Sequence, residues 1–123
     1  MTIKDRAILL IEDNRPLSDM LTFRLQDQGA VVHTAANESE VDDQLKQRSY
    51  DLILLDFMIP GTDGIEVLKK IKGMKIQTPV IMVTAKAMSM DRDMCLSHGA
   101  AAYVLKPIDF NLLFSTMDDL LAA

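Results

Sequence analysis

Five short runs of apolar residues recur along the chain, and each is separated from the next by a longer segment of mixed polarity. These runs are rich in valine, isoleucine and leucine and show little alternation with polar residues, which is typical of strands buried on both faces of a parallel sheet. None is long enough to span a bilayer. The runs are Ala7–Ile11, Val31–Ala35, Leu52–Leu55, Val80–Val83 and Ala102–Leu105.

The intervening segments have the apolar spacing and the end signals of amphipathic helices. The predicted helices cover residues 16–28, 64–72 and 89–98. Another is predicted where the capping-box pair Asn37 and Glu40 precedes Val41 and Leu45, and a last one is capped by Asp109. A chain that alternates strand and helix five times predicts an α/β fold with right-handed crossovers. We therefore expect a doubly wound, flavodoxin-like (βα)5 domain, with a five-stranded parallel sheet in the order 2-1-3-4-5 and helices on both faces.

Composition restricts the class of protein further. The 123 residues suit one domain covering residues 1–123, and 49% of them are hydrophobic, which is enough for a core. The net charge of −5 argues against nucleic-acid binding. The single cysteine, Cys95, cannot form an internal disulfide, and the first residues lack the pattern of a signal peptide. We expect a cytoplasmic protein without a membrane partner.

Polar residues stand at the carboxyl ends of four of the apolar runs. They are Glu12 and Asp13, Asp56, Thr84 and Lys106. Ligands of open α/β sheets bind beyond these strand ends, so three carboxylates, a hydroxyl and an ammonium group should share one crevice. Clustered carboxylates repel one another unless a hard cation such as Mg²⁺ joins them. Carboxylates, Mg²⁺, lysine and threonine together indicate phosphoryl transfer, in which an aspartate can itself be the nucleophile.

The strand-end motifs resemble, in order and position, the signature of the response-regulator receiver family of two-component signalling. The similarity covers essentially the whole chain, and the set of motifs is specific although each one alone is weak. The motifs are residues 11–14 (IEDN), 54–64 (LLDFMIPGTDG), 83–85 (VTA) and 106–107 (KP).

The resemblance implies a phosphoacceptor and a metal site. Asp56 would accept the phosphoryl group. Asp13, Asp56 and the backbone carbonyl of Met58 would bind Mg²⁺ directly, and Glu12 would act through a metal-bound water. Mn²⁺ is expected to substitute for Mg²⁺.

The resemblance also assigns the residues that would bind the phosphoryl group. Lys106 would pair with a phosphoryl oxygen and, before phosphorylation, with the acceptor carboxylate. The Thr84 hydroxyl and the backbone N–H of Ala85 would donate hydrogen bonds to the group. The Lys106-Pro107 peptide bond would be cis, which is uncommon in general.

Tyr103, three residues before the lysine, has two interpretations. It is either an aromatic residue covering part of the core or, as the family implies, a switch residue that moves inward when Thr84 shifts. Of the methionines near the fourth helix, Met82 and Met94 are expected to fill the core.

Met58 and Lys86 occupy the positions that flank the path of the hydrolytic water in the family. Met58 offers no polar group to orient water, and Lys86 adds a positive charge. These residues predict slow self-dephosphorylation.

The function implied is that of a phosphorelay switch, not of a turnover enzyme. A sensor histidine kinase or phosphotransfer protein would supply the phosphoryl group, and the face formed by the fourth helix, fifth strand and fifth helix would then change its affinity for a partner. The identity of that partner is open: it is a separate protein, a covalently linked output domain or, in a phosphorylation-dependent homodimer, a second copy of the chain.

The alternative function is a receiver-like interaction module that works without phosphorylation. A phosphohydrolase is disfavoured because Met58 stands where such enzymes place a second aspartate, and no nucleotide-binding glycine motif is present.

Overall fold

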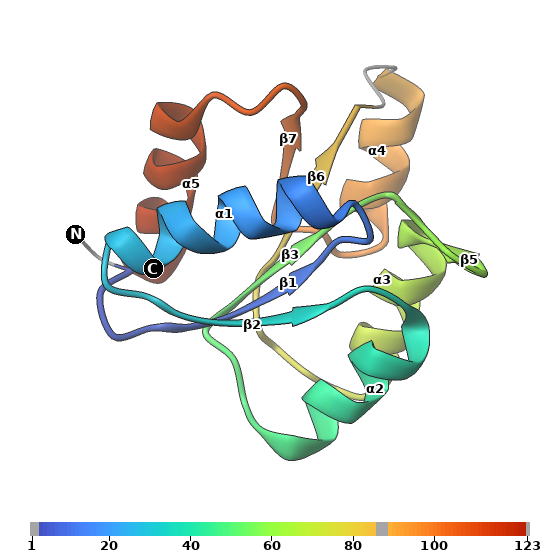
Figure 1. Cartoon of the computed structure of the whole chain (residues 1–123). Helices are drawn as coiled ribbons and strands as arrows, with labels where there is room; N and C mark the ends of the chain where they lie inside the picture. Colours follow the sequence, from blue (N-terminus) through green and yellow to red (C-terminus); the bar gives the residue numbers. More distant parts are fainter. Residues whose placement is uncertain (1–2, 86–88, 123) are drawn as a thin grey trace.

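The computed structural model describes residues 3–85 and 89–122, and within them strands and helices alternate as the sequence predicts (Figure 1). Five strands form a parallel sheet in the order β2-β1-β3-β6-β7. This is the predicted flavodoxin-like order 2-1-3-4-5, because the labels β4 and β5 belong to two short strands outside this sheet. The sheet strands are β1 (Ala7–Ile11), β2 (Val31–Ala35), β3 (Leu52–Leu55), β6 (Val80–Thr84) and β7 (Ala102–Leu105). The helices are α1 (Arg15–Asp27), α2 (Glu38–Gln47), α3 (Gly64–Gly73), α4 (Ser89–Ser97) and α5 (Phe110–Ala122).

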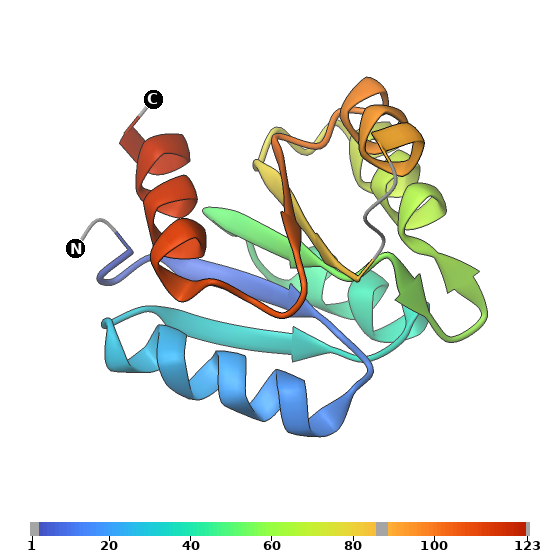
Figure 2. The ribbon, with the colours of Figure 1, turned by 90° about the horizontal axis from the view of Figure 1, so that it is seen from above.

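The sheet carries a separate apolar core on each face. Successive residues of a strand point to opposite faces, so Ile8 and Leu10 of β1 face one core while Leu9 and Ile11 face the other. The first core is closed by α1 and α5, and the second by α2, α3 and α4, as the two perpendicular views show (Figure 2). Burial on both faces explains why the strands lack polar alternation.

Helix ends follow the capping signals of the sequence. The Asn37 side chain accepts a hydrogen bond from the Glu40 N–H at 2.9 Å, and the Glu40 carboxylate in turn accepts one from the N–H of Ala36 at 2.7 Å. Asp63 caps α3, and Asp109 accepts from the Leu112 N–H at 3.2 Å at the start of α5. These caps satisfy backbone donors that have no partner inside the helix.

One feature of the fold was not predicted, and one residue differs from its predicted position. A two-stranded antiparallel ribbon, β4 (Met58–Ile59) and β5 (Thr62–Asp63), follows the third strand of the sheet. Met82 is fully buried as expected, but Met94 is 47% exposed, because it lies on the outer side of α4 while Cys95 faces the core. None of the helices among residues 3–85 and 89–122 is both long and apolar enough to cross a membrane.

Candidate functional site

Two neighbouring strands bring three carboxylates together. Ile11 pairs with Leu55 in the parallel register, so the residues that follow each strand emerge at the same level of the sheet edge. The three acidic residues there, Glu12, Asp13 and Asp56, each offer an oxygen, and these oxygens all lie within 4.8 Å of one another. We call them the acidic cluster. A set of hard oxygen donors this compact fits a divalent cation such as Mg²⁺.

Burial makes the charge of the acidic cluster costly. Glu12 is 4% exposed and Asp56 is 8% exposed, whereas Asp13 is open to solvent. Burial, followed by the interaction with Asp56, raises the pKa of Glu12, although hydrogen bonds from Lys106 and from the Asn14 N–H act in the opposite direction. A cation at the cluster would remove this conflict.

Among residues 3–85 and 89–122, Lys106 supplies positive charge to the site. The residue follows β7, and its N–H donates to the Thr84 carbonyl at 2.8 Å, which fixes it beside the end of β6. Its Nζ lies 2.8 Å from Glu12 Oε1 and 3.4 Å from Asp56 Oδ2. Lys106 therefore pairs with the expected Asp56 and also with Glu12, which is the closer of the two. Burial acts to lower the pKa of Lys106, but the Glu12 hydrogen bond and the Asp56 charge outweigh it and the pKa is raised. The Lys106-Pro107 peptide bond is cis.

The remaining site residues proposed from the sequence lie around the same strand ends. Thr84 ends β6 and is 2% exposed, and Ala85 follows it at the surface. Tyr103 is half-buried on β7, opposite Met82 in the register, and packs against the core covered by α2, α3 and α4. Burial raises the pKa of the Tyr103 hydroxyl. Lys86 lies outside the described residues.

Met58 and Gly64 shape the loop next to Asp56. The Met58 nitrogen lies 3.4 Å from Asp56 Oδ1, and Met58 is 58% exposed. A Cβ added to Gly64 would lie 2.8 Å from the Phe57 Cα and 3.1 Å from the Asp56 carbonyl oxygen. The start of α3 therefore packs directly on the backbone that carries Asp56. The sequence analysis placed Gly64 at the start of the predicted helix 64–72, and the contact with the backbone of Asp56 and Phe57 was not predicted.

A parallel α/β sheet with this acidic cluster, lysine and threonine at its carboxyl edge is the arrangement that the motifs of the sequence predict for a signalling receiver domain. The family model for the response regulator receiver domain matches residues 8–118. The chain therefore belongs to the response regulator receiver domain family of two-component signalling.

Solved receiver structures agree with this assignment over nearly the whole chain. A signal receiver domain from Colwellia psychrerythraea is 30% identical, with a TM-score of 0.89, and the match covers 97% of this chain and 100% of that one. A CheY-like receiver domain from Methanospirillum hungatei is 27% identical, with a TM-score of 0.89 and coverage of 97% and 95%. The receiver domain of a Pseudomonas aeruginosa sensor histidine kinase is 27% identical, with a TM-score of 0.87 and coverage of 97% and 99%, and it was solved with magnesium coordinated in its active site cleft.

Proposed function

We propose that this receiver domain accepts a phosphoryl group on Asp56 in a Mg²⁺-dependent reaction with a sensor histidine kinase or phosphotransfer protein as donor. One observation carries the proposal: the oxygens of Glu12, Asp13 and Asp56 lie within 4.8 Å of one another, with the Lys106 ammonium group beside them. The magnesium ion in the cleft of the Pseudomonas receiver domain supports the same cation at this cluster.

The three acidic residues have different parts in the proposed metal site. Asp13, Asp56 and the Met58 carbonyl would bind the cation directly, and the buried Glu12 would act through a water. When bound, Mg²⁺ (or Mn²⁺) would supply positive charge to the phosphoryl oxygens. Glu12 would meanwhile hold Lys106, its 2.8 Å partner, at the side of the crevice.

Asp56 and Lys106 carry out the transfer step. An Asp56 carboxylate oxygen attacks phosphorus in line, an O–P bond forms, and the bond from phosphorus to the donor nitrogen breaks with its electron pair leaving on the donor. Lys106 already lies 3.4 Å from Asp56 Oδ2, so its ammonium group can pair with a phosphoryl oxygen added there. No turnover of an external substrate is involved.

Phosphorylation is then proposed to shift the domain between two conformations. Thr84 and the Ala85 N–H would bond the new phosphoryl oxygens, and Tyr103, half-buried on the neighbouring strand, would move inward. The surface affected is the output face, formed by α4, β7 and α5. This face displays the exposed apolar side chains of Met90 and Leu105, which suit contact with a partner protein, a linked output domain or a second copy of the chain.

Met58 supports a long lifetime of the phosphoryl group. Its backbone nitrogen lies 3.4 Å from Asp56 Oδ1, and its exposed side chain has no group that orients a water molecule for attack. We therefore propose slow self-dephosphorylation; Lys86, the second residue assigned to this role, lies outside the described residues. The cytoplasm, where the kinase domains of two-component systems act, is the proposed location.

The test is incubation with acetyl phosphate and Mg²⁺ followed by intact mass measurement. The native protein should gain one phosphoryl group, and the gain should disappear with a chelator or in the Asp56→Asn variant, which keeps the shape of the side chain. No gain in the native protein would overturn the proposal in favour of an interaction module that works without phosphorylation.

A further inference from the structure

Met58 brings an oxidisable sulfur atom close to the acceptor carboxylate. Its backbone nitrogen lies 3.4 Å from Asp56 Oδ1. Since an N–Cα bond is about 1.46 Å long, the Met58 Cα lies within about 5 Å of that oxygen. The methionine side chain is unbranched and rotates freely about three bonds. Its sulfur can therefore reach the space beside a phosphoryl group on Asp56.

Met58 is also open to solvent. The residue is 58% exposed, whereas Ile59, which follows it in β4, is buried. Met58 pairs with Asp63 across the antiparallel ribbon, so the ribbon holds its backbone while its side chain stays accessible. Hydrogen peroxide oxidises an accessible thioether to a sulfoxide. One oxygen atom is transferred to the sulfur, the O–O bond of the peroxide breaks, and water leaves.

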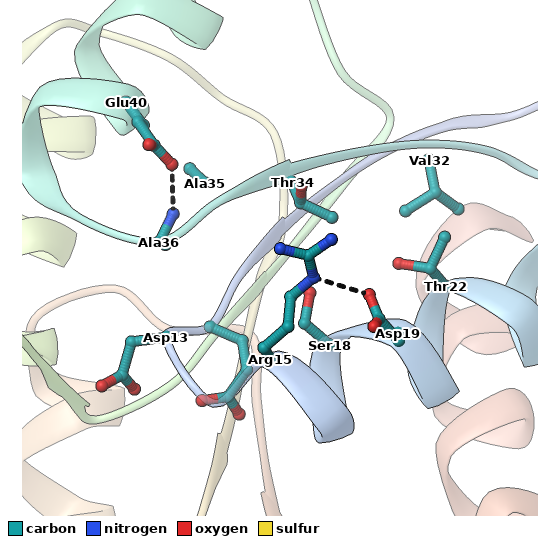
Figure 3. Close-up of a pocket in the computed structure, with 11 residues that line it drawn as sticks. Asp13, Arg15, Ser18, Asp19, Thr22, Val32, Thr34, Ala35, Ala36 and Glu40 are labelled. Carbon is teal, nitrogen blue, oxygen red and sulfur yellow. Dashed lines mark hydrogen bonds and ion pairs between the residues drawn. The ribbon is translucent and has the colours of Figure 1, made fainter.

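Several other sulfur atoms of the described residues are shielded from such an oxidant. Cys95 is buried, and burial raises the pKa of its thiol, so little reactive thiolate forms. Met82 and Met117 are fully buried. The pocket between α1, β2 and the start of α2 also borders the acidic cluster, at Glu12 and Asp13 (Figure 3). Its lining among residues 3–85 and 89–122 includes no methionine or cysteine, so a peroxide finds no sulfur there.

The remaining exposed methionines of the described residues lie on helices or at a helix end. They are Met20 on α1, Met74 at the end of α3, and Met90 and Met94 on α4. Met90 is the most exposed of them, at 73%. It is therefore the control for an effect of oxidation that has nothing to do with Asp56.

Oxidation changes how residue 58 can act on a water molecule. A thioether sulfur is a weak hydrogen-bond acceptor, so the native side chain leaves a water near the phosphoryl group without orientation. A sulfoxide is polar, and its oxygen accepts hydrogen bonds. A water held by this oxygen can attack in line. The water oxygen bonds to phosphorus, the bond from phosphorus to the Asp56 oxygen breaks with its electron pair returning to the carboxylate, and the water protons pass to phosphate and solvent.

We propose that Met58 is a reversible oxidation site, and that its conversion to the sulfoxide by a peroxide shortens the lifetime of the phosphoryl group. The proposal rests on the proposed function, because the effect requires a phosphoryl group on Asp56. Reduction of the sulfoxide restores the slow decay. The domain thus responds to two inputs, the phosphodonor and the oxidant, at one aspartate.

Peptide mass spectrometry and the decay of the phosphoryl group together test the proposal. The full chain is treated with hydrogen peroxide, freed of it and phosphorylated with acetyl phosphate and Mg²⁺, and the loss of phosphoryl mass is followed after the donor is removed. The peptide that contains Met58 should gain one oxygen. Decay should be roughly threefold to tenfold faster than in the untreated protein, because one hydrogen bond to the attacking water is gained. The two methionine sulfoxide reductases, one for each epimer, should restore the original decay.

Two variants locate the effect, and each is compared with its own untreated form. Met58→Leu removes the sulfur with little change in side-chain volume, and peroxide should not alter its decay. Met90→Leu removes the more exposed sulfur on α4, and peroxide should still accelerate its decay.

Several results would overturn the proposal. They are an unmodified Met58 at a peroxide concentration that oxidises Met90, an equal or slower decay in the oxidised native protein, and an acceleration that persists in Met58→Leu or disappears in Met90→Leu. Failure of the proposed function gives a different result, since the untreated native protein would then gain no phosphoryl group, and both proposals would be contradicted together. Normal phosphorylation with an unchanged decay after oxidation of Met58 would contradict this proposal alone.

Discussion

Replacing Gly64 by alanine tests whether the start of α3 fixes the backbone that carries Asp56. The added Cβ would lie 2.8 Å from the Phe57 Cα and 3.1 Å from the Asp56 carbonyl oxygen. Its third close contact, the Cε of Met82, is the end of a flexible side chain and can move away. The backbone atoms cannot move without moving Asp56.

The magnitude follows from these distances. Carbon atoms prefer a separation of about 3.5 Å or more, so the two backbone segments must part by about 0.7 Å. Overpacking of this kind costs about 1–3 kcal/mol of unfolding free energy. A displacement of the reacting group approaching 1 Å can slow a reaction by about a hundredfold. We expect Gly64→Ala to lose stability by this amount and to be phosphorylated roughly tenfold to a hundredfold more slowly.

Urea unfolding and the rate of phosphorylation by acetyl phosphate measure the two effects, and Gly73→Ala is the matched control. Gly73 ends the same helix and has no atom within 4 Å of an added Cβ, so alanine there should be neutral or stabilising by up to about 1 kcal/mol. Equal stability of the two variants would refute the steric reasoning. Lost stability with an unchanged phosphorylation rate would refute the link to Asp56.

Three further predictions concern other parts of the molecule. Lys106→Met, followed by the initial rate of acetyl phosphate labelling, should show a roughly hundredfold decrease because a preorganised charge is lost; a rate within twofold of native would contradict its role. Met58→Asn should shorten the phosphoryl half-life by giving the hydrolytic water a polar partner, and an unchanged decay would remove our explanation of slow dephosphorylation. Burial, with the charge of Arg48 at 2.9 Å, lowers the pKa of His33, so the unfolded chain binds more protons than the folded one. Stability should therefore fall as the pH drops below about 6.5, and His33→Asn should flatten this dependence in urea unfolding; identical pH profiles would contradict it.

The sequence predicts most of the fold because the pattern of the strands is unambiguous. Residues such as Leu9 and Leu10 face opposite cores, so each strand reads as a continuous apolar run whose end is easy to locate. Since parallel strands end at one edge, the clustering of Glu12, Asp13 and Asp56 could be predicted without coordinates. Of the five predicted strands, only Val80–Val83 was one residue too short, because Thr84 is polar and does not extend the apolar run.

Other features depend on contacts that no local pattern encodes. The ribbon of Met58–Ile59 and Thr62–Asp63 has strands of two residues, too short to show a period. The closer approach of Lys106 to Glu12 than to Asp56 depends on the relative positions of three strands. The orphaned hydroxyl of Thr22 likewise depends on how α1 packs against β2. These tertiary details decide which polar groups are paired, and the sequence leaves that open.

The position of the phosphoryl group within the chain tests the central claim most directly. Borohydride reduction of the acetyl phosphate-treated protein converts an aspartyl phosphate into homoserine, and peptide mass spectrometry then locates it. We expect homoserine at residue 56 alone, formed with Mg²⁺ and absent with chelator. Homoserine at another aspartate, or equal labelling without a divalent cation, would contradict it.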